Sequence, residues 1–403
     1  MRITYLHQYF NTPSMSGGTR SYEMARRLVS MGHQVNMITS WREADGRADW
    51  FTTDEAGIKV HWLPVPYSNH MDYNHRIAAF FKFAWGAGRR AASLPADVVF
   101  ATSTPLTIAL PGVYAARRRK VPLVFEVRDL WPELPIAMGA LDNPLARMAA
   151  RRLERFAYQS SVEIVGLSPG MVEGIVSTGF SPIKVTEIPN SSDLDLFHPS
   201  PDMRTSFRAE HGISESQLLV VYSGTFGRIN GVGYLSALAE ALVADKRFHF
   251  LMVGGGQEFN DVRAASRRIG VLDRNLTMLP RIAKAEMPKV LAAADIATSL
   301  FIPLPAMEAN SANKFFDGLA AGCCMAINYG GWQARMLQQT GAGLQLDRDV
   351  IVAARQLREL ADQPERIAHA KIAARQLAEE RFCRDKLAAQ LEKVLIRAVE
   401  NYS

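Results

Sequence analysis

Cysteine and long apolar runs are both scarce in this sequence. Three of its 403 residues are cysteine, and Cys323 and Cys324 are adjacent, which suits neither a disulfide framework nor a set of metal ligands and is typical of a reducing compartment. Residues 1–10 lack the apolar stretch of a signal peptide, so we expect none. The longest uncharged run, residues 98–116, matches a membrane span in length, but two prolines, a glycine and Thr102–Thr104 interrupt it. We therefore expect no transmembrane helix.

Two further absences exclude classes of function. The sequence has no G-x-G-x-x-G with an acidic partner at the right distance, which counts against a dinucleotide-dependent oxidoreductase. Its basic residues belong to no recognisable nucleic-acid-binding module, so we expect no nucleic-acid partner. What is present is the composition of a folded protein, 48% hydrophobic and 21% charged, in a chain long enough for two domains.

Positive charge is concentrated in residues 80–160. This segment contains twelve Lys or Arg and six Asp or Glu, so its net charge of +6 equals that of the whole chain. A basic field over part of a protein attracts phosphates, whether they belong to a substrate, an anionic lipid or a nucleic acid.

Strand and helix patterns alternate from one end of the chain to the other. This alternation predicts an α/β protein with parallel sheets covered by helices on both faces. Strands are expected at 2–6, 35–39, 98–101, 123–127 and 164–167 and, in a second series, at 218–223, 248–253 and 276–279. Each series opens with a strand, a glycine-containing loop and a helix, which is typical of Rossmann-like domains.

A turn-rich stretch at residues 189–201 separates the two series and is the predicted linker. We predict an N-terminal domain at 1–190, completed by the C-terminal helix at 384–403. The C-terminal domain is expected at 201–383.

Two glycine-containing loops each connect a predicted strand to the start of a predicted helix. Gly17 and Gly18 precede the first predicted helix, and the loop Gly224–Gly231 follows the first strand of the second series. Backbone N–H groups at a helix start favour anions, and glycine lets a phosphate approach them closely. Arg228, inside the second loop, offers a planar fork of donors to a diphosphate. The alternatives are a plain turn at the first loop and a solvent-facing Arg228.

Two charged segments are the remaining candidates. In the segment 310–317, Lys314 could hold phosphate while Asp317 accepts hydrogen bonds from sugar hydroxyls; a capped surface helix explains the segment equally well. The segment 126–133 leaves the end of a predicted strand, where open α/β sheets bind ligands. Its alternative is an internal cluster of ion pairs.

The order of these segments resembles glycosyltransferase family 4 over nearly the whole chain. Within that family it resembles the subgroup of lipopolysaccharide, capsule and exopolysaccharide enzymes that includes the L-fucosamine transferases. The motifs are an opening His-Gln-Tyr-Phe with Pro and Gly-Gly before Arg, then Asp-Leu-Trp-Pro, Asn-x-x-Asp-x-x-x-Phe, and Asn-Lys before a Phe-Asp helix. The matching residues are His7, Gln8, Tyr9, Phe10, Pro13, Gly17, Gly18, Arg20, Asp129–Pro132, Asn190, Asp193, Phe197, Asn313, Lys314, Phe316, Asp317, Ala321 and Gly322.

The resemblance implies a GT-B fold, two Rossmann-like domains facing each other across a cleft, and a retaining glycosyltransferase of the hexosyltransferase type. The donor is expected to be a UDP-linked nucleotide-sugar carrying an N-acetylated amino sugar or a deoxy sugar. The acceptor is expected to be a lipid-linked saccharide or another saccharide in cell-surface polysaccharide biosynthesis. Two alternatives stay open: a sugar-nucleotide epimerase of the same fold, which needs no acceptor, and a membrane-docked scaffold whose donor site has decayed.

The implied roles divide between the domains. Catalysis is assigned to Arg228 and Lys314, as fixed positive charges at the diphosphate leaving group, and to Asp129 on the acceptor side. The expected acceptor-binding residues are His7, Arg128 and Trp131. The expected donor-binding residues are Gly17, Gly18, Gly227, Arg281, Ile282, Glu308, Asn313 and Asp317.

The chain departs from the family at two positions. Asn230 stands where the donor loop usually carries Lys or Gln, and the first carboxylate of the family's Glu-x7-Glu pair would fall at Ala309, with Glu308 one residue early. Arg228 and Lys314 are therefore expected to carry most of the diphosphate binding. The literal D-x-D at 193–195 lies inside the linker motif, so we interpret it as structural and expect no essential metal and no cofactor.

Aromatic residues lie beside cations in residues 75–94. On a helix, one face would carry Ile77, Phe80, Phe81 and Leu94, widened by Phe83 and Trp85. We predict that this segment lies in the headgroup layer of an anionic membrane, strengthened by Arg117–Lys120 or Arg151–Arg152. The protein is therefore expected in the cytoplasm, peripheral on the inner face of the cell membrane. The alternative is that these aromatics pack in the core of the first domain.

Overall fold

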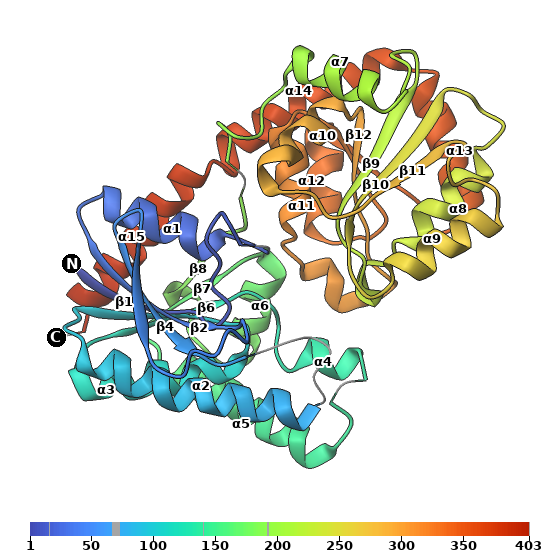
Figure 1. Ribbon diagram of the computed structural model, residues 1–403. Coiled ribbons are helices and arrows are strands. Elements are labelled where there is room, and N and C mark those ends of the chain that lie inside the picture. The colour runs from blue at the N-terminus through green and yellow to red at the C-terminus, as the bar shows by residue number, and fades with distance from the viewer. Residues whose placement is uncertain (16, 67–72, 140, 192, 403) are drawn as a thin grey trace. The chain divides into compact units, whose positions relative to one another are not determined.

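The chain folds as two units, which the computed structural model describes for residues 1–403 except 16, 67–72, 140, 192 and 403 (Figure 1). The N-terminal unit comprises Met1–Pro189 and Asp385–Ser403, and the C-terminal unit comprises Asn190–Arg384. Each has its own sheet and its own apolar core.

The described part of the N-terminal unit contains an eight-stranded sheet in the order β3-β4-β2-β1-β5-β6-β7-β8. The strands are β1 (Arg2–Leu6), β2 (Gln34–Trp41), β3 (Phe51–Glu55), β4 (Ile58–Pro64), β5 (Val98–Thr102), β6 (Leu123–Val127), β7 (Glu163–Gly166) and β8 (Val185–Glu187). The pairing is parallel throughout except between β3 and β4.

Both faces of this sheet are buried, each against its own apolar cluster. Successive side chains of a strand point to opposite faces and so enter different clusters. In β1, Ile3 and Tyr5 enter one apolar cluster, whereas Leu6 enters the other. Helices α1 and α15 cover the first face and α2, α3 and α5 the second (Figure 1). The helices of this unit are α1 (Arg20–Ser30), α2 (Tyr73–Ser93), α3 (Ala109–Arg119), α4 (Glu133–Ala137), α5 (Pro144–Gln159), α6 (Pro169–Ser177) and α15 (Arg384–Glu400).

The sequence analysis gave no strands to residues 51–64, where the structure has the hairpin β3–β4. Ala56 and Gly57 adopt φ of 54° and 81°, the left-handed conformations that a tight two-residue hairpin requires. Because β3, the edge strand, runs antiparallel to β4, the sheet is mixed at this edge rather than parallel throughout.

The C-terminal unit contains a six-stranded parallel sheet, among the described residues, in the order β11-β10-β9-β12-β13-β14. The strands are β9 (Leu218–Thr225), β10 (Phe248–Gly255), β11 (Leu276–Leu279), β12 (Ile296–Ser299), β13 (Cys324–Ile327) and β14 (Gly343–Gln345). Helices α8, α9 and α13 pack on one face, with α10, α11 and α12 on the other (Figure 1). The helices are α7 (Pro201–Glu210), α8 (Gly233–Ala241), α9 (Phe259–Arg268), α10 (Met287–Ala293), α11 (Asn313–Ala320), α12 (Trp332–Thr340), α13 (Val350–Ala361) and α14 (Pro364–Arg381).

Local sequence explains where several helices begin. Helices α5, α6 and α7 start at Asn143-Pro144, Ser168-Pro169 and Ser200-Pro201, and in each the capping side chain accepts a hydrogen bond from a backbone N–H of the first turn. None of the helices in the described part combines the length and apolar character needed to cross a membrane. The uncharged run 98–116 is instead the strand β5, a short turn and most of α3.

Each sheet has one point where the strand order reverses. In the N-terminal unit it lies between β1 and β5, and in the C-terminal unit between β9 and β12. Ligands of open α/β sheets bind outside the carboxyl ends of the strands at such points. These two places are therefore where functional side chains are expected.

Candidate functional site

Lys314 lies at the switch point of the C-terminal unit, in a cage of aromatic and amide groups. Its Nζ donates hydrogen bonds to Oδ1 of Asn230 at 2.8 Å and to the hydroxyl of Tyr222 at 3.2 Å. The same atom lies 4.7 Å from the centroid of the Tyr222 ring and 5.3 Å from that of Phe301. No described carboxylate pairs with it, and burial lowers the pKa of Lys314 to about 7. A buried cation without a counter-ion is suited to bind an anion.

The glycine loops after β9 and β10 pack against each other beside this lysine. A Cβ at Gly254 would lie 1.8 Å from the carbonyl oxygen of Gly224, and one at Gly256 would lie 2.5 Å from that of Phe226. Only glycine permits backbones to approach so closely. A Cβ at Gly224 would also lie 3.6 Å from Cε of Lys314, so the loop backbone adjoins the lysine side chain.

Two arginines border these loops. Arg228 begins the short turn Arg228–Asn230, and its exposed side chain has no hydrogen bond or ion pair among the described residues. Arg281, which follows β11, has its Cβ 3.8 Å from the position of a Cβ at Gly255. Ile282, next along the chain, is partly buried. The structure thus gathers Gly227, Arg228, Arg281 and Lys314 at the carboxyl ends of β9, β10, β11 and β12.

Three other predicted donor residues have different surroundings. Asn313 and Asp317 lie on α11 with Lys314, but the charges that act on Asp317 are those of Lys284, Arg384 and Asp193. Burial raises the pKa of Asp317 to about 6, against the effect of the two cations. Glu308 has its Oε1 3.3 Å from the position of a Cβ at Gly330, so its carboxylate adjoins the turn before α12.

The D-x-D segment of the linker is engaged in structural contacts. Arg384 donates a hydrogen bond to Oδ2 of Asp193 at 3.0 Å and another to the carbonyl oxygen of Ser191. Nothing in the part of the chain that the structure describes groups three or more His, Cys, Asp or Glu side chains for a metal ion.

His7 and Arg128 meet at the switch point of the N-terminal unit. Arg128 donates a hydrogen bond from Nη1 to Nε2 of His7 at 3.2 Å. Burial, with Arg128 and Arg42, lowers the pKa of His7 well below its usual value, so the ring is neutral with its proton on Nδ1. That N–H and the side-chain amide of Gln8 are buried without a partner among the described residues. A ligand hydroxyl is one group that would satisfy them.

Asp129 is held in place at the end of β6. Its Oδ2 accepts a hydrogen bond from the hydroxyl of Thr104 at 2.9 Å, and Ser103 accepts one from the backbone N–H of Arg128 at 3.0 Å. Burial raises the pKa of Asp129, while Thr104 and Arg128 oppose the rise. Trp131 is partly buried against the apolar cluster beneath α2 and α3. Sequence analysis missed Thr104, although the Ser-Thr-Pro turn after β5 marks this position.

Glu126, by contrast, is buried in an ion pair, which was the alternative to a ligand site for the segment 126–133. Its carboxylate pairs with Arg20 at 2.8 Å, and both side chains are almost completely buried. Arg20 therefore does not extend the anion site predicted at Gly17 and Gly18, which are exposed at the entry to α1. Gly17 adopts a φ of 129°, and the carbonyl oxygen of Gly18 accepts a hydrogen bond from Asn11 at 3.3 Å.

The aromatic segment 75–94 forms α2, and the structure corrects which of its residues face outward. Phe81 and Trp85 are 55% and 73% exposed, whereas Phe83 is 1% exposed within the core. The prediction that Phe83 widens an outward face is therefore wrong, because Phe83 is two residues from both Phe81 and Trp85, which places it on the opposite side of the helix. Ile77, Phe80 and Leu94 are partly buried, and the side chain of Arg76 lies outside the described residues.

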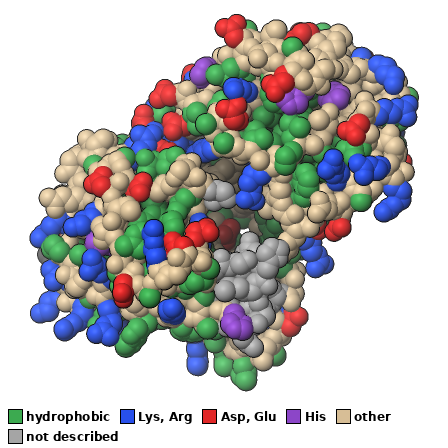
Figure 2. Space-filling view, viewed as in Figure 1, with side chains coloured by type: hydrophobic (Ala, Val, Ile, Leu, Met, Phe, Trp, Pro, Cys, Tyr) green, Lys and Arg blue, Asp and Glu red, His purple; other side chains and the backbone are tan. Residues whose placement is uncertain are grey.

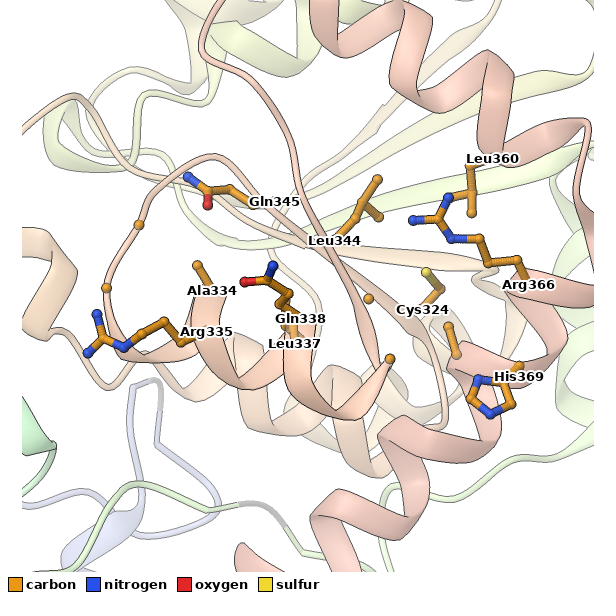
Figure 3. A pocket seen from close by; sticks show the side chains of 15 residues that line it. Cys324, Ala334, Arg335, Leu337, Gln338, Leu344, Gln345, Leu360, Arg366 and His369 are labelled. Carbon is orange, nitrogen blue, oxygen red and sulfur yellow. The ribbon is translucent and has the colours of Figure 1, made fainter.

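One cavity of about 610 Å³ lies elsewhere in the C-terminal unit, between α12, β14 and α14 (Figure 3). Arg335 and Gln345 lie toward one end of it, and Arg366 and His369 toward the other. Its lining includes none of the predicted site residues.

Part of the chain is similar in sequence to known proteins. Residues 17–191 match the family described as glycosyl transferase 4-like domain. The alpha-galactosylglucosyldiacylglycerol synthase of Streptococcus pneumoniae is 30% identical over 119 residues, which are 29% of this chain and 31% of the synthase. The match thus spans less than a third of that relative's length.

Solved structures match along nearly the whole chain. Anabaena HepE in complex with UDP-glucose superposes with a TM-score of 0.73 at 16% identity, covering 98% of this chain and 100% of HepE. WaaG, a glycosyltransferase involved in lipopolysaccharide biosynthesis, superposes with a TM-score of 0.69 at 18% identity, covering 98% and 99%. At these identities the likeness establishes the fold alone, and that fold is of the GT-B type.

Proposed function

We propose that this chain, whose residues 17–191 form a glycosyl transferase 4-like domain within a GT-B fold, is a retaining glycosyltransferase that uses a UDP-linked sugar. One observation carries the proposal. Lys314 presents a partly buried ammonium group, paired with no described carboxylate, at the β9/β12 switch point beside the glycine loop that contains Arg228. Nucleotides bind at such points in open α/β sheets, and a diphosphate needs positive charge there. HepE, of the same fold, binds UDP-glucose, which supports the choice of nucleotide.

In the proposed reaction, the bond between the anomeric carbon and the diphosphate oxygen breaks, and the acceptor oxygen bonds to that carbon on the same face of the sugar. The acceptor's proton passes to the departing diphosphate, so no protein carboxylate has to accept it. Arg228 and Lys314 stabilise the negative charge that develops on the diphosphate. We assign no step to a metal ion.

The remaining roles follow from position in the two units. Arg281 and Ile282 would flank the base, and Asn313 and Asp317 would bind the ribose or the sugar. Backbone groups at Gly227 would bind phosphate, whereas contacts of Glu308, Gly17 and Gly18 with the donor stay predictions. In the N-terminal unit, His7, Arg128, Asp129 and Trp131 would bind the acceptor, with the buried N–H of His7 free for a sugar hydroxyl.

The acceptor proposed is a lipid-linked saccharide of cell-surface polysaccharide biosynthesis, reached from the cytoplasmic face of the membrane. WaaG acts in lipopolysaccharide biosynthesis and the pneumococcal synthase is named for a glycosylated diacylglycerol, which supports this class of acceptor. The exposed Phe81 and Trp85 of α2 lie beside Lys82 and Arg89, and the guanidinium of Arg89 lies 5.9 Å from the Trp85 ring centroid. Figure 2 shows further Lys and Arg side chains along the side of this unit that α3 occupies. Such a surface suits anionic headgroups.

Thermal stability in the presence of UDP-, GDP- and dTDP-sugars tests donor binding, since a bound donor stabilises the fold by mass action. A UDP-sugar is expected to raise the melting temperature most. Product analysis with and without acceptor then separates the alternatives: a transferase needs the acceptor, and an epimerase does not. A protein that binds none of the nucleotide-sugars would contradict the proposal.

A further inference from the structure

Asn230 occupies the position of the donor loop where glycosyltransferases of this family usually carry Lys or Gln. We propose that Asn230 is a positioning residue: its side-chain carbonyl fixes the ammonium group of Lys314 against the loop while leaving its charge available to the diphosphate. This inference rests on the proposed function, because it concerns how the same donor site is built.

Asn230 is itself firmly placed. It is 8% exposed, and its backbone N–H donates a hydrogen bond to the carbonyl oxygen of Gly227 at 2.8 Å. Gly231, with a φ of 54°, closes the turn directly after it. The Oδ1 atom that accepts from Lys314 at 2.8 Å is therefore carried by a short backbone segment with a fixed conformation.

The described surroundings of Lys314 supply hydrogen-bond acceptors for two of its N–H donors. An ammonium group has three N–H donors. One goes to Asn230 and one to the Tyr222 hydroxyl, whose own proton is donated to the carbonyl oxygen of Thr225 at 2.7 Å. The rings of Tyr222 and Phe301 flank the group. The third donor is thus the one that can reach a phosphate oxygen.

The side chain at position 230 determines whether the positive charge of Lys314 is available to a diphosphate. An aspartate there would pair with Lys314 and neutralise it before the donor binds. A lysine there would bring a second ammonium group into the surroundings of the first, and nearby like charges oppose each other. A neutral amide oxygen holds the group without either effect.

A double-mutant cycle tests the coupling between the two side chains. UDP-glucose binding is measured by calorimetry for the wild type, Asn230→Ala, Lys314→Ala and the double variant. Because a hydrogen bond to a charged group is at stake, Asn230→Ala is expected to weaken binding about tenfold or more in the wild-type background. In the Lys314→Ala background it is expected to change binding by less than about twofold. Equal losses in both backgrounds would overturn the inference.

Asn230→Lys provides a second test. It distinguishes the proposed positioning role from the alternative that the loop needs only a polar residue at position 230. Although it adds a positive charge at a site for an anion, it is expected to bind UDP-glucose more weakly than Asn230→Ala. Asn230→Asp is expected to move the pH above which UDP-glucose affinity falls to a higher value, since a carboxylate raises the pKa of Lys314. Tighter binding by Asn230→Lys, or an unmoved pH profile in Asn230→Asp, would contradict the proposal.

A matched control is Asn275→Ala. Asn275 is 7% exposed in the same unit and donates one side-chain hydrogen bond, to the carbonyl oxygen of Ala239 at 2.8 Å, away from Lys314. It is expected to lower the melting temperature without changing UDP-glucose affinity, and circular dichroism confirms that each variant is folded. If the wild type binds no nucleotide-sugar, the proposed function is contradicted. If Lys314→Ala impairs binding but the double-mutant cycle shows no coupling between Asn230 and Lys314, only this inference is contradicted.

Discussion

The guanidinium group of Arg20 lies 2.8 Å from the carboxylate of Glu126, and their side chains are 3% and 1% exposed. Thr102 donates a hydrogen bond to the second carboxylate oxygen, and Arg20 also donates to the carbonyl oxygens of Ile188 and Pro189. These bonds join α1, the ends of β5 and β6, and the last residues of the N-terminal unit before the chain enters the other unit. The network satisfies charges that could not otherwise remain buried.

Replacing Glu126 by Leu is expected to lower the free energy of unfolding by about 3–5 kcal/mol, because it removes the carboxylate that balances the buried charge of Arg20. Urea unfolding followed by circular dichroism measures the loss. Asp362→Ala is the control: the pair Arg247–Asp362 is 43% and 66% exposed, and its loss should cost less than about 1 kcal/mol. Equal costs for the two variants would contradict the assignment of Arg20 and Glu126 to a buried pair.

This pair shows what a single sequence can and cannot predict. The strands β5 and β6, which carry Thr102 and Glu126, follow from continuous apolar residues, which are a local pattern. The pairing of Arg20 with Glu126, 106 positions apart, depends on which strands become neighbours, so local patterns left Glu126 open between a ligand site and an internal pair.

The same distinction holds in the donor site and on α2. Sequence alone proposes Lys314 and Arg228 as donor-site residues, but the contact of Lys314 with Asn230 arises only because β9 and β12 are adjacent. On α2, helical spacing grouped the aromatics, and only the packing of α2 against the sheet and α3 determines that Phe83 is inside while Phe81 and Trp85 are outside. Of the hairpin β3–β4, which the sequence analysis did not predict, β3 is a short polar strand at the edge of the sheet, whereas β4 carries the alternating apolar residues Ile58, Val60 and Trp62 that are typical of a strand.

Arg228→Ala and Lys314→Ala are each expected to lower kcat and kcat/KM on the order of 10²–10³-fold, because we propose that both cations stabilise charge that develops in the transition state. Melting temperatures should stay near that of the wild type for Arg228→Ala, whose side chain is exposed. Arg263→Ala, an exposed cation on α9 in the same unit, should keep wild-type turnover. Variants of Arg228 and Lys314 with wild-type kcat would remove them from the site.

UDP-glucose affinity is expected to fall as the pH rises above about 7. Burial lowers the pKa of Lys314 to about 7, so the charged form dominates below that pH and the neutral form above it. The bound diphosphate favours the charged form, so binding at higher pH requires uptake of a proton. Calorimetry between about pH 6 and pH 9 measures the trend, since the diphosphate of a UDP-sugar does not titrate in that range.

Lys314→Arg is the matched control for this pH dependence. Arginine stays protonated throughout, so its affinity for UDP-glucose should be flat over the same pH range, whatever its absolute value. A wild-type affinity that does not change between about pH 6 and pH 9 would show that Lys314 does not titrate at the donor site.

Changing both Phe81 and Trp85 to Ser is expected to release the protein from vesicles that contain anionic phospholipid, because these are the exposed aromatics of α2. Flotation measures the bound fraction, which should also fall with added salt in the wild type. Activity toward a soluble acceptor should survive in this variant, since neither side chain belongs to the donor or acceptor site.

Phe83→Ser controls for unfolding in the same helix. Phe83 is 1% exposed in the core, so its loss should destabilise the unit by about 3–5 kcal/mol while leaving the outward face unchanged. Vesicle binding by the Phe81 and Trp85 double variant that equals that of the wild type would contradict attachment through α2.

The most direct test of the account is to follow, by NMR, the anomeric proton of a UDP-sugar whose sugar is α-linked to the diphosphate while the protein acts on it with membrane-derived acceptor. The account predicts that the α-linked donor disappears, that UDP accumulates in equal amount, and that the first product formed carries the sugar in an α-linkage, with no turnover when acceptor is omitted. A β-linked first product, or conversion of the UDP-sugar without acceptor and without release of UDP, would contradict it.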